Sequence, residues 1–393
     1  MFAGITGNIL ILGLVSFLTD VSSEMIYPLL PFFLTSVLGA GPAFLGVIEG
    51  VAESTAALLK LVSGIMVDRM PTRKPLVLAG YTLSSICRPL VAIAGTPLAV
   101  LFIRFADRVG KGVRTSPRDA LIADSVTRDM RGKAYGFHRS MDHAGAIVGP
   151  LVATLLLTWF VADLRTVFWL AAIPGIGAVL LIIFSVREAE RRKGAADGGF
   201  LRIVPAGPLR RYLLVMFLFT LGNSSDAFLL LRAGQLGVTP ARIPLLWTFF
   251  HVVKMFSAMP FGALSDRLGR RGMISAGWLV YALAYAGFAM AARELHVWLL
   301  FAVYGLFYGL TEGTEKALLV DIADSRQRGV AFGWFNLATG VGAFPASLMF
   351  GFIWQGAGAV WAFGFGAGIA LLALCLLLFL VTVPREDAGR SRY

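Results

Sequence analysis

The sequence predicts an all-α membrane protein with twelve transmembrane helices. Of its 393 residues, 57% are hydrophobic and 15% are charged, and the mean hydropathy of +0.76 is far above that of soluble globular proteins. Each span needs roughly 20 apolar residues to cross a hydrocarbon core about 30 Å thick, so twelve spans with short connectors occupy almost the whole chain. Because the two halves of the sequence also repeat each other, we expect two pseudo-symmetric six-helix bundles.

Long apolar runs follow one another from the N-terminus to a short charged tail. The first run has no basic residue before its apolar core and continues into Asp20 and Glu24, which indicates a retained helix and not a cleaved signal. Charged or glycine-rich connectors separate the later runs. The predicted spans are about 8–35, 42–66, 75–95, 98–122, 134–158, 167–186, 211–232, 242–264, 273–292, 297–321, 331–354 and 360–383.

Basic residues outside the spans concentrate in alternate connectors. Connectors on one side of the membrane hold clusters such as Arg128, Arg131 and Lys133, whereas those on the other side hold single arginines. The positive-inside rule then places both termini in the cytoplasm, in a multi-pass protein of the inner or plasma membrane. Membrane topology therefore explains the net charge of +12, and we expect no nucleic-acid partner.

A long connector divides the chain near its middle. It runs from Arg187 to Arg211, is charged and rich in glycine, and has no sustained apolar period. We therefore expect an N-terminal bundle over residues 1–190, a cytoplasmic linker over 191–210 and a C-terminal bundle with a short cytoplasmic tail over 211–393.

Four short motifs occur in both halves, in the same order and at nearly the same spacing. They are Ser22-Ser23-Glu24 with Ser224-Ser225-Asp226, Gly64-x-x-x-Asp68-Arg69 with Gly262-x-x-x-Asp266-Arg267, Ile122-Ala-Asp-Ser125 with Ile322-Ala-Asp-Ser325, and Arg131-Gly-Lys-Ala-Tyr-Gly136 with Arg328-Gly-Val-Ala-Phe-Gly333. An ordered series of this kind indicates two homologous six-span halves. Such halves are the architecture of transporters that rock around a central site.

The motifs resemble those of the major facilitator superfamily over essentially the whole chain. The resemblance implies a twelve-helix transporter fold and a gating role for two cytoplasmic loops, at Gly64, Asp68, Arg69, Gly262, Asp266, Arg267 and Arg271. In span 5, Gly145, Gly149 and Pro150 lie at the spacing of the family's antiporter motif, which implies proton-coupled antiport. In span 4, Arg108 fits the family's arginine motif, with Lys111 in place of its usual glutamine.

The fourth span carries a stripe of charge. Six residues fall within about a third of the helix circumference: Arg104, Asp107, Arg108, Lys111, Arg114 and Arg118. In lipid such a stripe is costly unless it faces water or opposite charge. Arg104, Arg108 and Lys111 are therefore candidates for binding an anionic group of a substrate. The alternative, to which we give equal weight, is that the arginines form buried salt bridges with nearby carboxylates.

Carboxylates inside the spans are the candidate proton carriers. A carboxyl group kept from bulk water holds a proton more readily, which is the chemistry that proton coupling needs. Glu24 is the first candidate, because Asp226 occupies the equivalent position in the second half. The full candidate set is Glu24, Asp20, Glu53, Asp107, Asp142 and Asp226. The alternative is that each of them caps a helix or pairs with a base such as Arg88 or Lys60.

The second half replaces charge by aromatic residues at the equivalent positions. Tyr304 and Tyr308 occupy the positions of Arg104 and Arg108, and together with Asn336 they are candidate substrate contacts. An aromatic wall opposite a charged one would suit a solute with an apolar body and a charged end. Ordinary helix packing is the alternative.

The predicted function is secondary active transport of a small anionic or amphipathic organic solute, by proton-coupled efflux. Uptake of an organic anion by symport is the alternative. A membrane-embedded enzyme or a transporter-like sensor is less favoured, because no nucleophile elbow, nucleotide loop or signalling domain is present. The cysteines and histidines lack metal-ligand spacing, so we expect no cofactor and no metal. The expected partners are the solute, protons and the lipid bilayer, and the expected state is a monomer.

Overall fold

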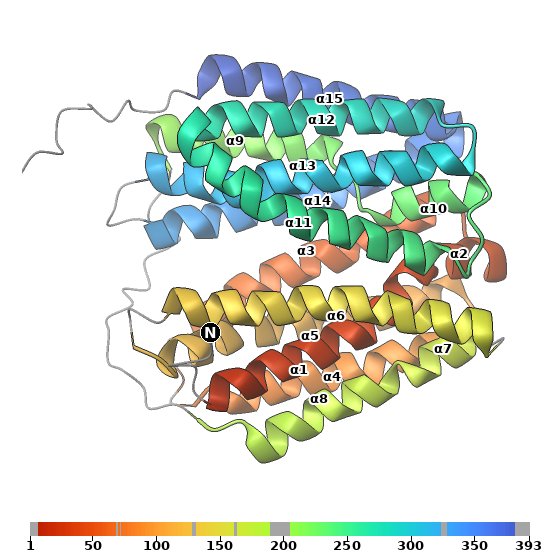
Figure 1. Ribbon diagram of the computed structural model, residues 1–393, viewed down its shortest axis with the longest axis vertical. Coiled ribbons are helices and arrows are strands. Elements are labelled where there is room, and N and C mark those ends of the chain that lie inside the picture. The colour runs from red at the N-terminus through yellow and green to blue at the C-terminus, as the bar shows by residue number, and fades with distance from the viewer. Residues whose placement is uncertain are drawn as a thin grey trace, which may run out of the picture.

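The structure is a computed structural model, which describes residues 7–67, 70, 72–127, 131–160, 163–188, 205–323 and 328–381. All regular secondary structure in these ranges is helical, and the long helices run side by side in a lower and an upper group (Figure 1). Ten helices of the described part are long and apolar enough to cross a membrane. The predicted all-α membrane fold is therefore confirmed.

The first span is continuous but changes its winding. After α1 (Gly7–Ile26) it passes through the 3-10 helix η1 (Tyr27–Leu29), α2 (Leu30–Phe32) and the π-helical η2 (Phe33–Val37). Pro28 contributes to the change, because proline cannot donate the backbone hydrogen bond of a regular helix. The other helices of the first half are α3 (Pro42–Val67), α4 (Lys74–Leu90), η3 (Val91–Ile93), α5 (Pro97–Asp124), α6 (Arg131–Trp159), α7 (Leu164–Leu170) and α8 (Ala172–Ser185).

The seventh span is interrupted near its centre. Helix α9 (Gly207–Gly222) stops before the residues Asn223 to Asp226, and α10 (Ala227–Gln235) continues after them. This interruption falls on the repeated Ser-Ser-acid motif, whereas the equivalent residues of α1 stay helical. The remaining helices are α11 (Ile243–Leu268), α12 (Arg270–Met290), α13 (Glu294–Ile322), α14 (Arg328–Ala357) and α15 (Ala359–Leu380).

Each of the twelve predicted spans overlaps one of these helices or a consecutive series of them. The two long helices that are not among the ten simple apolar spans are α3 and α5. Both carry several charged residues between their ends. These charged side chains lie at the contact between the two helices. The predicted boundary between the halves stays a prediction, because residues 189–204 lie outside the described ranges.

Glycines bring the charged helix α5 close to α4. A Cβ atom on Gly110 would lie 2.6 Å from the carbonyl oxygen of Gly80, and a Cβ on Gly80 would lie 2.6 Å from that of Gly110. No side chain larger than hydrogen fits at this crossing. The close approach holds the charged stripe of α5 against its neighbours, so its side chains have little freedom to turn toward lipid.

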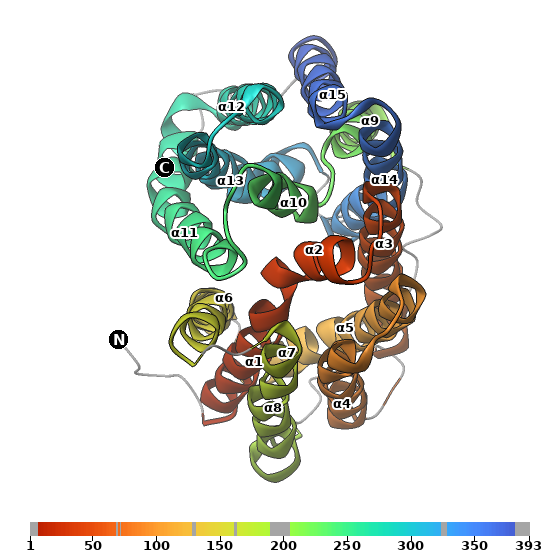
Figure 2. The same ribbon diagram turned by 90° about the vertical axis from the view of Figure 1, so that its right-hand side faces the viewer.

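The two halves of the molecule meet toward one end. We call the end where α8 finishes and α9 begins the linker end, and the opposite end the far end (Figure 1). Between α3 and α14, the amide of Ala43 donates to Gln355 Oε1 (3.2 Å), and Ser54 Oγ donates to the carbonyl of Gly340 (2.9 Å). Seen from the far end, α2 and α10 lie together at the centre, where they are in contact (Figure 2). The far end is therefore closed by helix contacts between the halves.

Candidate functional site

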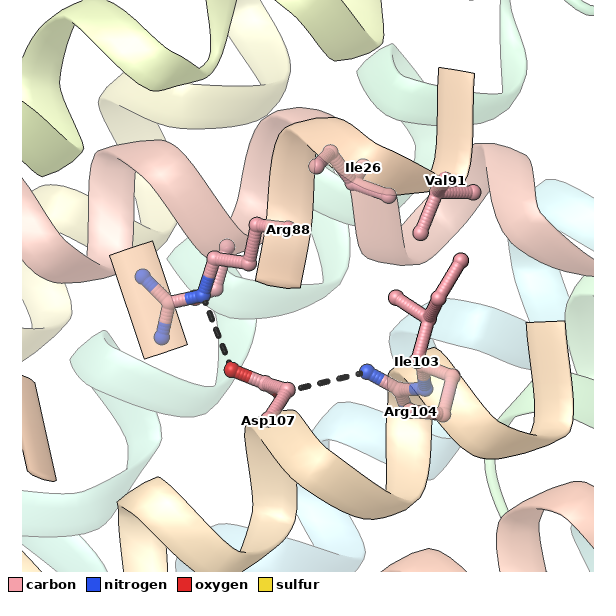
Figure 3. A pocket seen from close by; sticks show the side chains of 7 residues that line it. Ile26, Arg88, Val91, Ile103, Arg104 and Asp107 are labelled. Carbon is pink, nitrogen blue, oxygen red and sulfur yellow. Dashed lines mark hydrogen bonds and ion pairs between the residues drawn. The ribbon is translucent and has the colours of Figure 1, made fainter. Parts of the chain in front are cut away.

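Asp107 of α5 is surrounded by three arginines. Its Oδ1 lies 3.2 Å from Nε of Arg88 on α4, and its Oδ2 lies 3.9 Å from Arg104 Nη1 and 3.6 Å from Arg108 Nη1. Figure 3 shows Arg88 and Arg104 on either side of Asp107, around a cavity of about 20 Å³ that has room for one water molecule. Both oxygens of Asp107 are thus within ion-pair distance of guanidinium groups, and its proton-coupling role stays a prediction.

Two carboxylates of α3 complete this ionic cluster. Glu49 Oε1 lies 2.9 Å from Arg104 Nη2, and Glu53 Oε1 lies 3.3 Å from Arg108 Nη2. Glu49 is only 1% exposed, and its Oε2 accepts a 3.1 Å hydrogen bond from Ser225 of the opposite half. The structure thus contains the salt bridges of the alternative interpretation, and the substrate-binding role of Arg104 and Arg108 stays a prediction.

Lys111 and Arg114 of α5 differ from Arg104 and Arg108 in their partners or exposure. Lys111, at the middle of the helix and on the same face, is exposed and makes no ion pair with any described residue. Arg114 is buried, donates to Ser84 Oγ (2.5 Å) and lies 4.4 Å from the centre of the Tyr81 ring. Lys111 is therefore an exposed base of the stripe, and its substrate-binding role stays a prediction.

The candidate proton carriers of α1 lie against the predicted antiporter glycines. A Cβ on Gly145 would lie 2.8 Å from Asp20 Cβ, and a Cβ on Gly149 would lie 3.0 Å from Glu24 Cβ. Pro150, the next residue, lies inside α6 without ending it. The glycines let α6 pack directly on the face of α1 that carries both carboxylates. The candidate proton carriers and the antiporter-motif glycines, which were predicted separately, thus lie at the same helix contact.

Glu24 also contacts the opposite half of the molecule. Nε1 of Trp247, near the start of α11, donates a 2.8 Å hydrogen bond to Glu24 Oε2. The Trp247 ring is in turn 5.4 Å from the ring of Tyr27 on η1. Sequence reasoning did not identify Trp247, because no local pattern distinguishes it from a tryptophan that only packs in a helix. Asp20, one helical turn before Glu24, has no hydrogen bond or ion pair to its carboxylate from the described residues.

Asp226 occupies the interruption of span 7 and is held by tyrosines. Tyr304 Oη donates a 2.6 Å hydrogen bond to Asp226 Oδ1, and Tyr308 Oη lies 3.3 Å from Oδ2. The neighbouring Ser224 Oγ lies 3.2 Å from Tyr285 Oη. Tyr304 is completely buried and holds Asp226 in this conformation, and its role as a substrate contact stays a prediction. Tyr308 is half-buried and can still do both.

A second ionic cluster links the halves toward the linker end. Arg139 of α6 lies 2.8 Å from Glu312 of α13, and Lys254 Nζ lies 3.1 Å from the other Glu312 oxygen and 4.1 Å from the centre of the Tyr308 ring. Asp142, a predicted proton carrier, lies 3.7 Å from Arg139 and accepts a hydrogen bond from Ser16. The predictions for the site omitted Arg139, Lys254 and Glu312, because their roles depend on contacts between distant helices.

Comparison with known proteins identifies the family. The sequence model described as "Major Facilitator Superfamily" matches residues 12–232 and again residues 212–392. The chain belongs to the major facilitator superfamily. It is 33% identical to an uncharacterised MFS-type transporter of Methanocaldococcus jannaschii, over 88% of each chain.

More distant relatives agree with this assignment. The chain is 20% identical to the multidrug resistance protein MdtH of Salmonella arizonae, over 81% of this chain and 79% of MdtH. A crystal structure of a mutant of the nucleoside transporter NupG has the same fold, with a TM-score of 0.80 at 14% identity, covering 95% of this chain and 100% of NupG. The chain is therefore an MFS transporter, a class whose members are in general not enzymes.

The predicted MFS loop motifs lie largely outside the described residues. Asp68 and Arg69 are not described, nor is the side chain of Asp266. Among the rest, Arg267 is exposed, and Nη2 of Arg271 donates to the carbonyl of Leu378 on α15. Gly64 faces Ser116 of α5, whereas Gly262 faces open space. The gating role of these loops stays a prediction.

The remaining predicted contact, Asn336, is exposed on α14. Within the described part of the chain, no group of three or more His, Cys, Asp or Glu side chains is arranged to hold a metal ion. The candidate site of this MFS protein is thus made of carboxylates, bases and aromatic rings between its halves.

Proposed function

We propose that this protein is a proton-coupled secondary transporter that exports a small organic solute by alternating access. The observation that carries the proposal is the arrangement of Asp20 and Glu24. These half-buried carboxylates lie one turn apart on α1, have no ion-pair partner among the described residues, and pack against the antiporter-motif glycines of α6. A carboxylate without a cationic partner inside a membrane protein is costly unless it serves to bind a proton or a cationic group.

The distribution of contacts supports alternating access. At the far end the halves are joined by the hydrogen bond from Ala43 of α3 to Gln355 of α14 and by the contact between α2 and α10. By contrast, charged side chains near the centre and toward the linker end are open to solvent: Lys111 is exposed, as are 45% of the Glu53 side chain and 56% of the Arg139 side chain. We assign the linker end to the cytoplasm by the positive-inside rule, so this conformation would face inward.

Glu24 offers a physical link between protonation and the movement of the halves. While it is ionised, it accepts a charge-assisted hydrogen bond from Trp247 across the boundary. Protonation weakens that bond, so the free-energy difference between the inward-facing and outward-facing states depends on whether a proton is bound. This dependence is what coupling between proton and solute requires.

Transport assays in proteoliposomes test the proposal. Purified protein should move solute against its gradient when a pH gradient is imposed, and Glu24→Gln should lose at least about tenfold of this pH-driven transport. The matched control is Glu294→Gln, which also removes one carboxylate, but from a far-end ion pair with Arg242. Glu294→Gln should keep the response. A pH response that survives in Glu24→Gln would remove Glu24 as the proton carrier.

Symport of an organic anion is the second candidate, and one observation favours it. Lys111 is exposed and has no carboxylate partner within ion-pair distance among the described residues. The same vesicles separate the two candidates: in antiport, the solute moves in the direction opposite to the proton, whereas in symport both move together. Similarity to MdtH, a multidrug resistance protein, supports efflux.

A cell-membrane location with cytoplasmic termini, and a monomeric state, complete the proposal. Labelling of a cysteine added to the C-terminal tail should require permeabilised cells. Light scattering of the purified protein should give the mass of one 42.3 kDa chain plus detergent.

A further inference from the structure

We propose that the transported solute is an organic cation and that Lys111 limits the number of positive charges it can carry. The inference rests on the proposed transport function and names the substrate class of the same site. It reverses our first expectation, which was that the basic stripe of α5 selects an anion.

Two arginines of the stripe and Arg88 of α4 are already neutralised, and Arg114 is buried against Ser84 and the Tyr81 ring. Arg88, Arg104 and Arg108 face an equal number of carboxylates within ion-pair distance, on Asp107, Glu49 and Glu53. All three guanidinium groups are at least nine-tenths buried. An incoming anion would have to displace Asp107 or Glu49 and leave a buried carboxylate without a partner, which is strongly unfavourable, or compete with Glu53 for Arg108, which is itself only 7% exposed. The cluster therefore offers no net positive charge to a solute.

The second ionic cluster is also balanced. Toward the linker end, Arg139 and Lys254 are opposite Asp142 and Glu312, with nitrogen to oxygen distances between 2.8 and 3.7 Å. Neither cluster therefore contributes net charge to the space between the halves.

The charges that remain are mainly negative. Asp20, Glu24 and Asp226 have no ion-pair partner among the described residues. Lys111 is an exposed base that acts electrostatically on Asp20 and Glu24. Asp226 is satisfied by two tyrosine hydroxyls, but Glu24 has only the Trp247 indole and Asp20 has no side-chain partner in the described part. The groups that act electrostatically on Asp20 are Glu24 of the same helix and, from neighbouring helices, Asp142, Lys111 and Arg88.

The surroundings of these carboxylates also suit a cation. The rings of Tyr27 and Trp247 lie beside Glu24, with their centres 5.4 Å apart. Aromatic faces attract cations through their electron-rich centres. The protein already uses its tyrosines in this way, because Arg104 lies 5.6 Å from the Tyr27 ring centre and Lys254 lies 4.1 Å from that of Tyr308.

Lys111 sets the size of the negative excess. It interacts electrostatically with both Asp20 and Glu24, and its charge offsets one of the two carboxylates. The pair together with Lys111 then carries one net negative charge, which one monocation or one proton neutralises. Without the lysine the pair carries two, and a dication fits the balance. This makes Lys111 a specificity-determining residue for the charge of the solute.

The first experiment tests the sign of the charge with two ions of the same shape. Tetraphenylphosphonium and tetraphenylborate are titrated into the purified full-length protein in detergent at pH 8, and binding is measured by calorimetry. We expect tetraphenylphosphonium to bind at least about tenfold more tightly. Equal or tighter binding of tetraphenylborate, or no binding of tetraphenylphosphonium, overturns the cation assignment. This assay needs no proton gradient, so its failure is distinct from failure of pH-driven transport.

The second experiment tests the role of Lys111 with hexyltrimethylammonium and hexamethonium, which carry one and two trimethylammonium groups on the same six-carbon chain. Wild type should prefer the monocation, and Lys111→Met should raise the relative affinity for the dication about tenfold. Lys111→Arg should keep the wild-type preference because it keeps the charge. Lys60→Met, which removes an exposed positive charge nearer the linker end of α3, should also keep it.

If Lys111→Met is folded and the ratio of the two affinities is unchanged, the role of Lys111 is overturned. A shift toward the dication in Lys60→Met as large as that in Lys111→Met also overturns it. The melting temperature without ligand establishes whether each variant is folded. If Lys111→Met does not fold, Asp20→Asn provides the test from the opposite direction. Asp20→Asn should weaken binding of hexyltrimethylammonium about tenfold, and unchanged binding would contradict the charge balance.

Discussion

Nε1 of Trp247 donates a 2.8 Å hydrogen bond to Oε2 of Glu24, and the two residues belong to opposite halves of the molecule. Trp247 is buried near the start of α11, which lies toward the far end of the molecule. Glu24 lies on the face of α1 that packs on α6. Separation of the halves at the far end would break this bond. A group proposed to carry the proton is thus in direct contact with the boundary that must open.

Trp247→Phe should make the far end open more often. The change keeps an aromatic ring but removes the donor to a charged group, a bond that contributes about 1.5–3 kcal/mol. Loss of about 1.4 kcal/mol from the closed state raises the open population about tenfold. The readout is the rate of maleimide labelling of Ala43→Cys, at the far-end contact with Gln355, in a background without the two native cysteines. An unchanged labelling rate would contradict this role of the bond.

Gly149→Ala should destabilise the protein and slow transport. The added Cβ would lie 2.7 Å from the carbonyl oxygen of Val21 and 3.0 Å from Glu24 Cβ, so α6 must move away from α1. Overpacking of this kind costs about 1–3 kcal/mol. Gly136→Ala, on the same helix with nothing within 4 Å of the added atom, is the matched control. Thermal unfolding in detergent should show a lower melting temperature for Gly149→Ala alone.

Arg104→Met should lower stability strongly if Arg104 is a structural ion-pair partner. Its removal leaves Glu49, which is only 1% exposed, without a cation, at a cost of about 3–5 kcal/mol. The double variant Arg104→Met with Glu49→Gln should regain most of the loss, since the amide can still accept the hydrogen bond from Ser225. Melting temperatures of the two single variants and the double variant give the comparison. A stable single variant that no longer binds solute would instead restore the substrate-binding role.

Asp163 should make a pH-dependent contribution to stability. It lies outside the spans, caps α7, and accepts a 2.7 Å hydrogen bond from the amide of Thr166. Hydrogen bonding from the Thr166 side chain, and then from its amide, lowers the pKa of the carboxyl group below its usual 3.8. A lowered pKa in the folded state stabilises the protein above pH 3.8, and this stabilisation is lost as the pH falls through the folded-state pKa. Asp163→Ala should therefore melt below wild type at pH 7, and the difference should shrink at pH 3.

Asp163→Asn is the control for this effect. Asparagine also caps helices but does not titrate, so its difference from wild type at pH 7 should be smaller than that of alanine. A difference between Asp163→Ala and wild type that is the same at pH 7 and pH 3 would contradict the role of the ionised cap.

The number and order of the helices could be read along the chain. Hydropathy over about 20 residues and the repeated motifs are properties of the sequence itself, so the spans were predicted within a few residues of their ends. The charges of α5 also indicated that this helix needs water or ionic partners, because ionisable residues in an apolar run are otherwise costly, and carboxylates of α3 and α5 pair with its arginines. The internal break of span 7 was not predicted, since Asn223 to Asp226 look like the helical residues of span 1.

The partners of the charges depended on the folded arrangement. Trp247 is 223 residues from Glu24 in the sequence, and Glu49 contacts Arg104 on the neighbouring α5 and Ser225 on the opposite half. A row of arginines has the same sequence pattern whether it binds a solute or is neutralised by carboxylates from another helix. Hydropathy and repeats are local along the chain, whereas the net charge of a site is a sum over side chains from several helices. For this reason the transporter fold followed from the order of residues, and the excess of negative charge in its passage emerged only from the three-dimensional packing.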